Sequence, residues 1–443
     1  MSRGSTKIII VGGGFGGLNA AKRLARKDHS LEITLVDKHN YHNFQPLLYQ
    51  VATGGLNPGE IAVPLRTEFS KYHNVNVLLG EVTDVNLEKR LVYSDAGVFY
   101  YDYLILACGA QHSYFGHEEW EPFAPGLKTL EQAAEIRRRI LLSFELAERE
   151  KDPEKIRQYL TFAIIGGGPT GVELAGTLGE IVRYTLSRDY RNISPKQTRI
   201  VLIEAGPRIL PSFSEKLAKR ATYDLEYLGV TVWTNSRVTD ITNEGITING
   251  NVRLNAHTVL WAAGVLPSNL NQTLGVPLDR AGRVIVEPDL SLPGHPEVFV
   301  IGDQAHVEEN GRVLPGLAPV AMQEGRYVAD TILNDLAGKP RTPFRWIDKG
   351  QMATIGRSRA VAQTGGFEFG GILAWFTWII VHIYYLVGFK NRVLVLIQWF
   401  WSYITFRRGA QLIINRDWES FKPRPLIPEK QAEKMTDKKA ILS

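Results

Sequence analysis

The chain has only one cysteine, Cys108, among its 443 residues. A single thiol excludes an intramolecular disulfide, a Cys-x-x-Cys redox pair and a zinc site made of several thiolates. The ten histidines show no spacing typical of metal ligands, so we expect no metal site. Apolar runs long enough to cross a membrane are missing too. The two near the C-terminus, 372–387 and 393–406, hold 16 and 14 uncharged residues, whereas a span needs about 20.

The body of the chain lacks an excess of either charge. Residues 371–443 contain 11 Lys+Arg and 5 Asp+Glu, a net charge of +6, whereas the other 370 residues sum to −1. A neutral body argues against a nucleic-acid-binding protein, so we expect no nucleic-acid partner. The apolar share of 44% and the charged share of 22% are those of a folded globular protein. The basic excess therefore indicates a specific role for the C-terminus.

A dinucleotide-binding pattern opens the chain. Residues 7–11 read as a buried parallel strand, 12–17 are Gly-Gly-Gly-Phe-Gly-Gly, 19–26 have helical spacing, and 31–36 form a second strand that ends at Asp37. In G-x-G-x-x-G the first glycine permits the tight turn, the second lets a pyrophosphate approach, and the third lets the helix pack closely. The acid at the end of the second strand can bind a ribose diol. The alternative is a Gly-rich turn in an unrelated α/β protein.

The same pattern recurs about 154 residues later. Strand 160–165 leads into Gly166-Gly-Gly-Pro-Thr-Gly171 and a helix, and a later strand, 199–203, ends at Glu204. A carboxylate there accepts from the ribose 2′-OH of NADH and repels the 2′-phosphate of NADPH. We therefore expect a preference for NADH, although the nearby Arg208 could weaken it.

Three further segments extend the pattern: 104–110 and 260–265, which end in small residues, and Ile301-Gly302-Asp303 after a late apolar strand. The whole resembles the two-dinucleotide-domain flavoprotein reductases. The resemblance implies an α/β fold with two Rossmann-like domains, the NADH domain inserted in the FAD domain. The FAD contacts that it implies are Gly12, Gly14, Gly17, Asp37, Gln45, Pro46, Val82, Gly109 and Asp303. Those implied for NADH are Gly166, Gly168, Gly171, Glu204 and Gly264.

These motifs predict the domain limits. We expect the first part of the FAD domain in residues 1–115 and the NADH domain in 116–285. The second part of the FAD domain follows in 286–345, a membrane-anchoring region in 346–415, and a mobile basic tail in 416–443.

The lack of a second cysteine limits which electron acceptors are possible. Disulfide reductases need two cysteines, as do sulfide oxidisers that carry sulfur on paired thiols, so both classes are excluded. The remaining acceptors are quinones, another electron carrier or oxygen. Segments 41–53, 166–175 and 317–329 are similar to those of the type II NADH dehydrogenases, which are single-subunit NADH:quinone oxidoreductases. That resemblance implies two-electron transfer from NADH through FAD to a membrane quinone, without proton pumping.

The same resemblance indicates the residues near the reacting groups. Glu173 is expected to sense or relay charge near the nicotinamide–flavin contact; alternatively it is a surface residue of its helix. Ala318, Pro319 and Gln323 are expected on the quinone side, although Pro319 stands where the family often has glutamine. Gln323 could instead be a plain polar residue of the first helical turns. Lys349 resembles a position close to the flavin.

The C-terminal runs 372–387 and 393–406 predict two helices joined at Lys390-Asn-Arg392. Eleven of residues 371–406 are aromatic, and Trp, Tyr, Lys and Arg favour the headgroup level of a membrane. We therefore expect a helical hairpin lying in one leaflet. The alternatives are a buried helix pair, a two-span anchor or a dimer interface, and a homodimer is compatible with the hairpin. Residues 1–6 lack a signal-peptide pattern, which favours the cytoplasmic face of a prokaryotic membrane.

Two other functions stay open from the residues alone. One is a FAD- and NADH-binding redox sensor or interaction protein of the same fold with slow turnover. The other is a soluble reductase of a protein carrier, for which the C-terminal segment would be dispensable.

Overall fold

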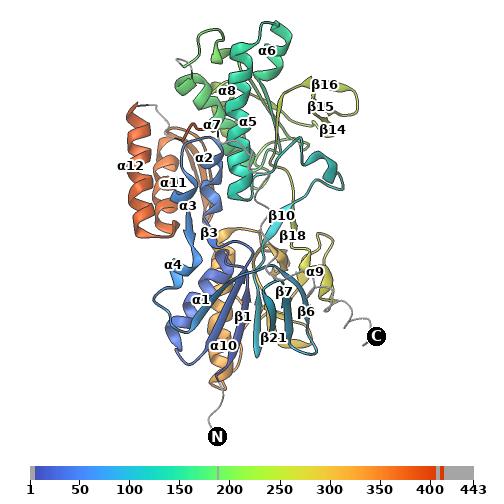
Figure 1. Cartoon of the computed structure of the whole chain (residues 1–443), viewed down its shortest axis with the longest axis vertical. Coiled ribbons are helices and arrows are strands. Elements are labelled where there is room, and N and C mark those ends of the chain that lie inside the picture. Colours follow the sequence, from blue (N-terminus) through green and yellow to red (C-terminus); the bar gives the residue numbers. More distant parts are fainter. Residues whose placement is uncertain (1–4, 187–188, 406–409, 414–443) are drawn as a thin grey trace, which may run out of the picture.

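The computed structural model describes residues 5–186, 189–405 and 410–413. A six-stranded sheet forms the lower half of the molecule (Figure 1). In spatial order its strands are β20 (Ser291–Leu292), β21 (His295–Val300), β9 (Tyr103–Leu106), β1 (Lys7–Val11), β2 (Glu32–Asp37) and β5 (Val75–Leu79). All neighbours pair in parallel except β20 and β21. Because β21 comes from late in the sequence, the first domain is discontinuous, as predicted.

A second sheet lies in the upper half, with the order β13 (Val230–Trp233), β12 (Arg199–Ile203), β11 (Thr161–Ile165) and β17 (Thr258–Trp261). Its pairs are all parallel. Every residue of β11 and β17 is buried, as expected for parallel strands covered on both faces. The helices of this domain include α5 (Leu130–Arg149), α6 (Pro153–Tyr159), α7 (Pro169–Glu180) and α8 (Glu215–Tyr227).

The two domains repeat one another beyond their glycine motifs. In the first, an antiparallel sheet of β6 (Val82–Asn86), β7 (Leu91–Ser94) and β8 (Gly97–Tyr100) precedes β9. In the second, β14 (Val238–Thr242), β15 (Gly245–Ile248) and β16 (Val252–Asn255) precede β17 in the same way. This shared order confirms two Rossmann-like units in one chain.

The chain crosses between the domains twice. The crossing strands are β10 (Ala110–His112) and β18 (Val265–Pro267), which pair antiparallel. Beyond β18, Leu270 and Leu274 already pack in the core of the first domain. The domain limits remain a prediction, and this packing favours a second boundary near residue 268 in place of 285.

The last part of the chain touches both domains. β25 (Gln351–Gly356), β26 (Arg359–Thr364) and β27 (Phe367–Gly370) form an antiparallel sheet, with β25 packed against α7. The helices α11 (Ile372–Tyr385) and α12 (Phe389–Thr405) follow. The indole of Trp399 donates to Oε1 of Gln50 in the first domain at 2.7 Å. The two helices therefore form one flank of the molecule, opposite β14–β16 (Figure 1).

The predicted hinge at Lys390–Arg392 is wrong, because α12 begins at Phe389 and the turn is confined to residues 386–388. Lysine and arginine are good helix formers, and Nε of Arg392 caps α11 by donating to the carbonyl of Leu386 at 2.7 Å. The other end of α12 is capped by Arg357, whose guanidinium donates to the carbonyls of Ser402 and Tyr403. The predicted tail 416–443 lies outside the described residues.

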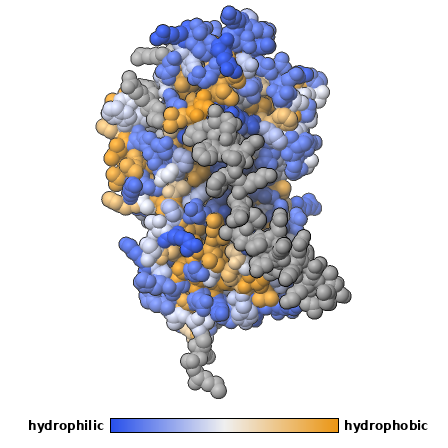
Figure 2. Space-filling model, viewed as in Figure 1, coloured by the Kyte–Doolittle hydropathy of each residue, from blue (hydrophilic) through white to orange (hydrophobic). Residues whose placement is uncertain are grey.

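Within the described ranges, none of the helices has the length and apolar character to cross a bilayer. Both α11 and α12 nevertheless expose an apolar face (Figure 2). The exposed side chains of this apolar face are Ile372, Leu373, Phe376, Ile380 and Tyr384 on α11, and Phe389, Val393, Leu394, Leu396, Ile397, Phe400, Trp401, Tyr403 and Ile404 on α12.

Candidate functional site

The two glycine loops are built alike. Gly12 and Gly166 have φ values of +102° and +110°, a region that favours glycine. A Cβ on Gly12 would overlap the backbone of Ala107, just after β9, and a Cβ on Gly166 that of Ala262, just after β17. Likewise, a Cβ on Gly17 or Gly171 would overlap the carbonyl oxygen of the first glycine. Each loop leads directly into a helix, α1 (Phe15–Lys27) or α7, and the free N–H groups at such a helix N-terminus suit a phosphate.

The acids after each second strand also correspond. Asp37 accepts from the N–H of Gly13 at 2.5 Å and from that of His39 at 2.6 Å. Glu204 accepts from the N–H of Gly167 and from that of Gly206, both at 2.7 Å. Each carboxylate is thereby fixed beside its glycine loop, and its remaining lone pairs are available to a ribose diol.

The first loop leaves room for a dinucleotide. An added Cβ on Gly14 or on Gly109 would meet nothing within 4 Å. Asp303 belongs to η6 (Gly302–Gln304) and lines a small cavity together with Gly316 and Leu317. Nζ of Lys128 lies 3.8 Å from Oδ2 of Asp303. Open backbone at two glycines and a carboxylate facing a cavity fit FAD as the resident group.

The other residues predicted to contact FAD flank this cradle. Gln45 and Pro46 form η1 (Gln45–Leu47), which continues into α2 (Leu48–Ala52). Val82 opens β6 and packs against the core of the first domain. The contacts of these three residues with FAD stay predictions.

The structure shows whether Arg208, near Glu204, could bind the 2′-phosphate of NADPH. The guanidinium of Arg208 donates to the carbonyls of Phe213 and Pro211 at 2.8 and 2.9 Å. An arginine committed to backbone carbonyls is poorly placed to bind a 2′-phosphate. Arg208 therefore does not oppose the preference that Glu204 predicts.

Glu173 is buried, so the surface alternative is excluded for it. It lies on α7 between the second domain and the C-terminal region. Its Oε1 accepts from the N–H of Thr354 on β25 at 3.4 Å, and the indole of Trp378 on α11 lies near its carboxyl without a well-formed hydrogen bond. Burial raises the pKa of Glu173 to about 8, so the carboxyl holds a proton at neutral pH.

The predicted quinone-side residues lie at the start of α10 (Ala318–Leu336), where Ala318 and Pro319 occupy the first turn. Proline suits this position because its missing N–H would have no helical partner. The side-chain amide of Gln323 donates to the carbonyl of Ile347 at 3.1 Å and accepts from its N–H at 3.0 Å. This pairing ties α10 to the segment that leads to β25, and a contact of Gln323 with quinone stays a prediction.

Lys349 is placed by the C-terminal helices. Its Nζ donates to the hydroxyl of Tyr385 at the end of α11, at 3.0 Å. Lys349 and Glu173 therefore both lie against α11, Lys349 at Tyr385 and Glu173 at Trp378. The sequence indicated each residue separately but not this shared helix.

Three residues beside the site were missed from the sequence. His42 is buried on β3 (Tyr41–Asn43), with Nδ1 2.9 Å from the carbonyl oxygen of Gly13. Phe115 is 66% exposed, and its ring lies against Gly264. Glu324 is buried on α10 and accepts from the N–H of Gly302 at 2.6 Å. Of the three, only Glu324 carries a signal in the sequence, a carboxyl next to the predicted Gln323, and this pair is not a motif.

Comparison with known proteins decides the family. Residues 6–325 match the model of the pyridine nucleotide-disulphide oxidoreductases, and residues 349–408 match that of the NDH2 C-terminal domain. The type II NADH:quinone oxidoreductase Ndh of Mycobacterium tuberculosis is 46% identical over 93% of this chain and 90% of its own length. The chain belongs to the type II NADH:quinone oxidoreductases.

Other members are similar over nearly the same range. NdhA of Mycobacterium tuberculosis, also a type II NADH:quinone oxidoreductase, is 44% identical over 93% of this chain and 90% of its own. The structure of NDH2 from Plasmodium falciparum in complex with NADH superposes with a TM-score of 0.84 at 23% identity. It covers 93% of this chain and all of that one. The sulfide:quinone oxidoreductase of Aquifex aeolicus shares the fold, with a TM-score of 0.71 at 19% identity, over 88% of this chain and 92% of that one.

Proposed function

We propose that this type II enzyme transfers two electrons from NADH through FAD to a lipid-soluble quinone while α11 and α12 lie in one leaflet of a membrane. The observation that supports this best is the 46% identity across both nucleotide units and the C-terminal domain. Bound FAD supplies the two-electron chemistry, and the protein positions the two substrates against it.

The chain's own residues bind and orient these groups. The loop 12–17 and Asp303 would hold FAD, and the loop 166–171 with Glu204 would hold NADH. Both glycine loops lie at the carboxyl ends of parallel strands, where such sheets bind nucleotides. Glu173 carries a proton near neutral pH in a place that water reaches poorly. We assign to Glu173 the sensing or relay of charge, as a proton, near the nicotinamide–flavin contact.

Membrane attachment follows from the apolar face of α11 and α12. Several of its side chains are more than half exposed, such as Ile380 at 68%, Phe389 at 81% and Phe400 at 67%. A patch of this size is costly in water and marks an interaction surface. Lys390 stands beside it and suits anionic headgroups. Because quinones dissolve in the bilayer, a leaflet-bound α11 also brings their source close to Lys349 and Glu173.

The side of the membrane follows from the substrate. NADH is a cytoplasmic reductant, and the Mycobacterium and Staphylococcus relatives are bacterial. We therefore place the protein on the cytoplasmic face of a prokaryotic inner membrane. Part of the same apolar face could pair two copies, and the mass of the detergent-solubilised protein would distinguish a homodimer from a monomer.

An acceptor panel tests the proposal. The purified protein should carry FAD, NADH should bleach the flavin under anaerobic conditions, and a short-chain quinone should restore it repeatedly. A redox sensor would be reduced once and then stall under excess NADH. Failure of NADH to bleach bound flavin would refute the enzyme function.

A further inference from the structure

Glu324 links two parts of the FAD cradle. It is only 1% exposed, and its Oε2 accepts from the N–H of Gly302 at 2.6 Å. Gly302 has a φ of +75° and directly precedes Asp303. The conformation of this turn decides where the Asp303 carboxylate points, so the Glu324–Gly302 hydrogen bond acts on Asp303 through the backbone.

The helix that carries Glu324 is held rigidly to the first glycine loop. Gly325 meets Gly16 of α1 so closely that a Cβ would overlap the carbonyl oxygen of Gly16. Further along the same pair of helices, Arg23 bonds Asp330 through two hydrogen bonds of 2.7 and 2.8 Å. Glu324 therefore moves with the pyrophosphate loop.

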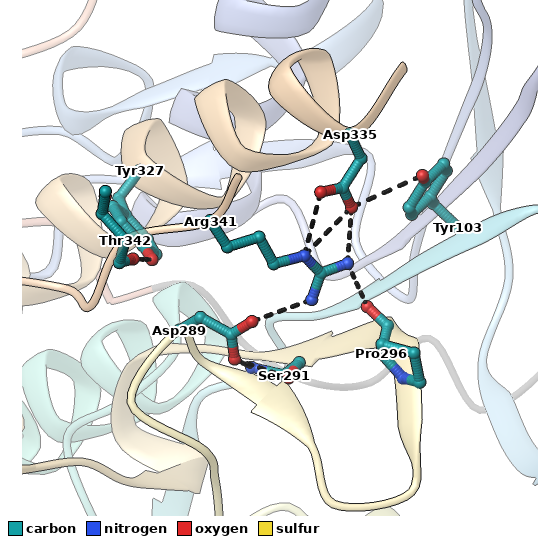
Figure 3. Close-up of polar contacts among 8 residues, drawn as sticks. All are labelled: Tyr103, Asp289, Ser291, Pro296, Tyr327, Asp335, Arg341 and Thr342. Carbon is teal, nitrogen blue, oxygen red and sulfur yellow. Dashed lines mark hydrogen bonds and ion pairs between the residues drawn. The ribbon is translucent and has the colours of Figure 1, made fainter. Parts of the chain in front are cut away.

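The far end of α10 is fixed as well (Figure 3). Arg341 bonds Asp335 on α10 and, at 2.8 Å each, donates to Oδ2 of Asp289, just before β20, and to the carbonyl of Pro296 on β21. These contacts fix the C-terminal end of α10 to the β20–β21 edge of the first sheet. Because α10 is fixed, Glu324 holds Gly302 in a defined position.

The charge on Glu324 matters because Asp303 lines the same cavity. Burial, together with the negative charge of Asp303, raises the pKa of Glu324 to about 8, against the lowering effect of the Gly302 hydrogen bond. Of the cations around this cavity, Arg283 is paired with Asp279 at 2.7 Å, and Lys128 faces Asp303. Nothing in the described residues compensates an ionised Glu324 directly.

We propose that Glu324 is a positioning residue for FAD that acts as a neutral carboxylic acid, holding Gly302 and Asp303 in place without adding a second negative charge to the cradle. The inference rests on the proposed function, since FAD is the group expected there. An ionised Glu324 would repel both Asp303 and the phosphates of the dinucleotide.

The experiment compares FAD binding from pH 6 to pH 9 in the wild type, Glu324→Gln and Glu324→Leu. FAD is removed, added back, and its dissociation constant is measured by flavin fluorescence. A single ionisation near pH 8 weakens wild-type binding by up to about tenfold between pH 7 and pH 9. Glu324→Gln keeps the acceptor oxygen and cannot ionise, so its binding should match the wild type at pH 7 and stay constant. Glu324→Leu should bind FAD weakly at every pH.

The matched control is Asp330→Asn, which weakens the contact of α10 with α1 but leaves Gly302 untouched, and its binding should keep the wild-type pH profile. Circular dichroism confirms that each variant is folded. A pH profile in Glu324→Gln equal to that of the wild type, or unchanged affinity in Glu324→Leu, would overturn the role of Glu324. Absence of FAD binding in all proteins at all pH values would instead refute the proposed function itself.

Discussion

Replacing three exposed side chains on the two C-terminal helices should release the enzyme from membranes without unfolding it. Ile380, Phe389 and Phe400 expose 68%, 81% and 67% of their surfaces. Fully burying such a side chain contributes about 1.5–3 kcal/mol, so the exposed part of each contributes about 1–2 kcal/mol on insertion. Each change to serine should then lower the partition coefficient about 5- to 30-fold. The partition coefficient of the triple variant should fall at least about a hundredfold.

Point variants are better suited to this test than a deletion from Gly371. Trp378 and Val395 lie on the inner faces of α11 and α12 and pack in the main core, so a deletion would also destabilise the second domain. The control is Val252→Ser, which removes a 48% exposed apolar side chain from β16, on the flank opposite the two helices (Figure 1).

The assay measures co-sedimentation with vesicles and, in parallel, NADH oxidation with a vesicle-borne quinone and with a water-soluble acceptor. The triple variant should remain in the supernatant, lose activity with the vesicle-borne quinone and keep activity with the soluble acceptor. If it sediments as the wild type does, the apolar face of α11 and α12 is not the membrane contact.

Four further outcomes follow from the site. Glu204→Ala should lower the NADH-over-NADPH ratio of kcat/KM at least about tenfold, because a hydrogen bond to a charged group is lost. Glu173→Gln should raise the unfolding temperature at pH 8 but not at pH 4. The raised pKa of Glu173 means that its stability contribution is fully present below the unfolded value of about 4.3 and is lost as pH rises towards about 8. Gly325→Ala should cost about 1–3 kcal/mol in urea unfolding, because α10 is pushed from α1. Phe115→Ala should raise the KM for NADH about 2- to 10-fold, the range of one aromatic contact, with FAD content unchanged.

The sequence predicted best the residues whose place is set within one strand–turn–helix–strand unit. Gly12, Gly166, Asp37 and Glu204 occupy their expected places, because within such a unit the strand pairing and the glycine turn fix their geometry. The features that it missed depend on contacts between units. The sequence offered two interpretations of Glu173, a role beside the reacting groups and a surface place on its helix, and only the cover by β25 and α11 excludes the second.

The same reason explains the differences at the C-terminus and on α10. Lys390 and Arg392 looked like a polar hinge, but only the fold shows that the turn closes by residue 388 and that Arg392 caps α11. Gln323 matched a quinone motif in the sequence. Its bonds to Ile347, 24 residues away, arise from the path that the chain takes into β25.

The duplicated units differ most where their tasks differ. Gly109 and Gly264 hold equivalent places after the third strand of each sheet, with φ values of +69° and +70°. The space beside Gly109 is open, whereas the ring of Phe115 lies against Gly264. A resident cofactor needs permanent access to the backbone beside Gly109. A substrate that enters and leaves at every turnover can instead use the ring of Phe115 beside Gly264 as an apolar contact, so Phe115 marks a place where the two units differ.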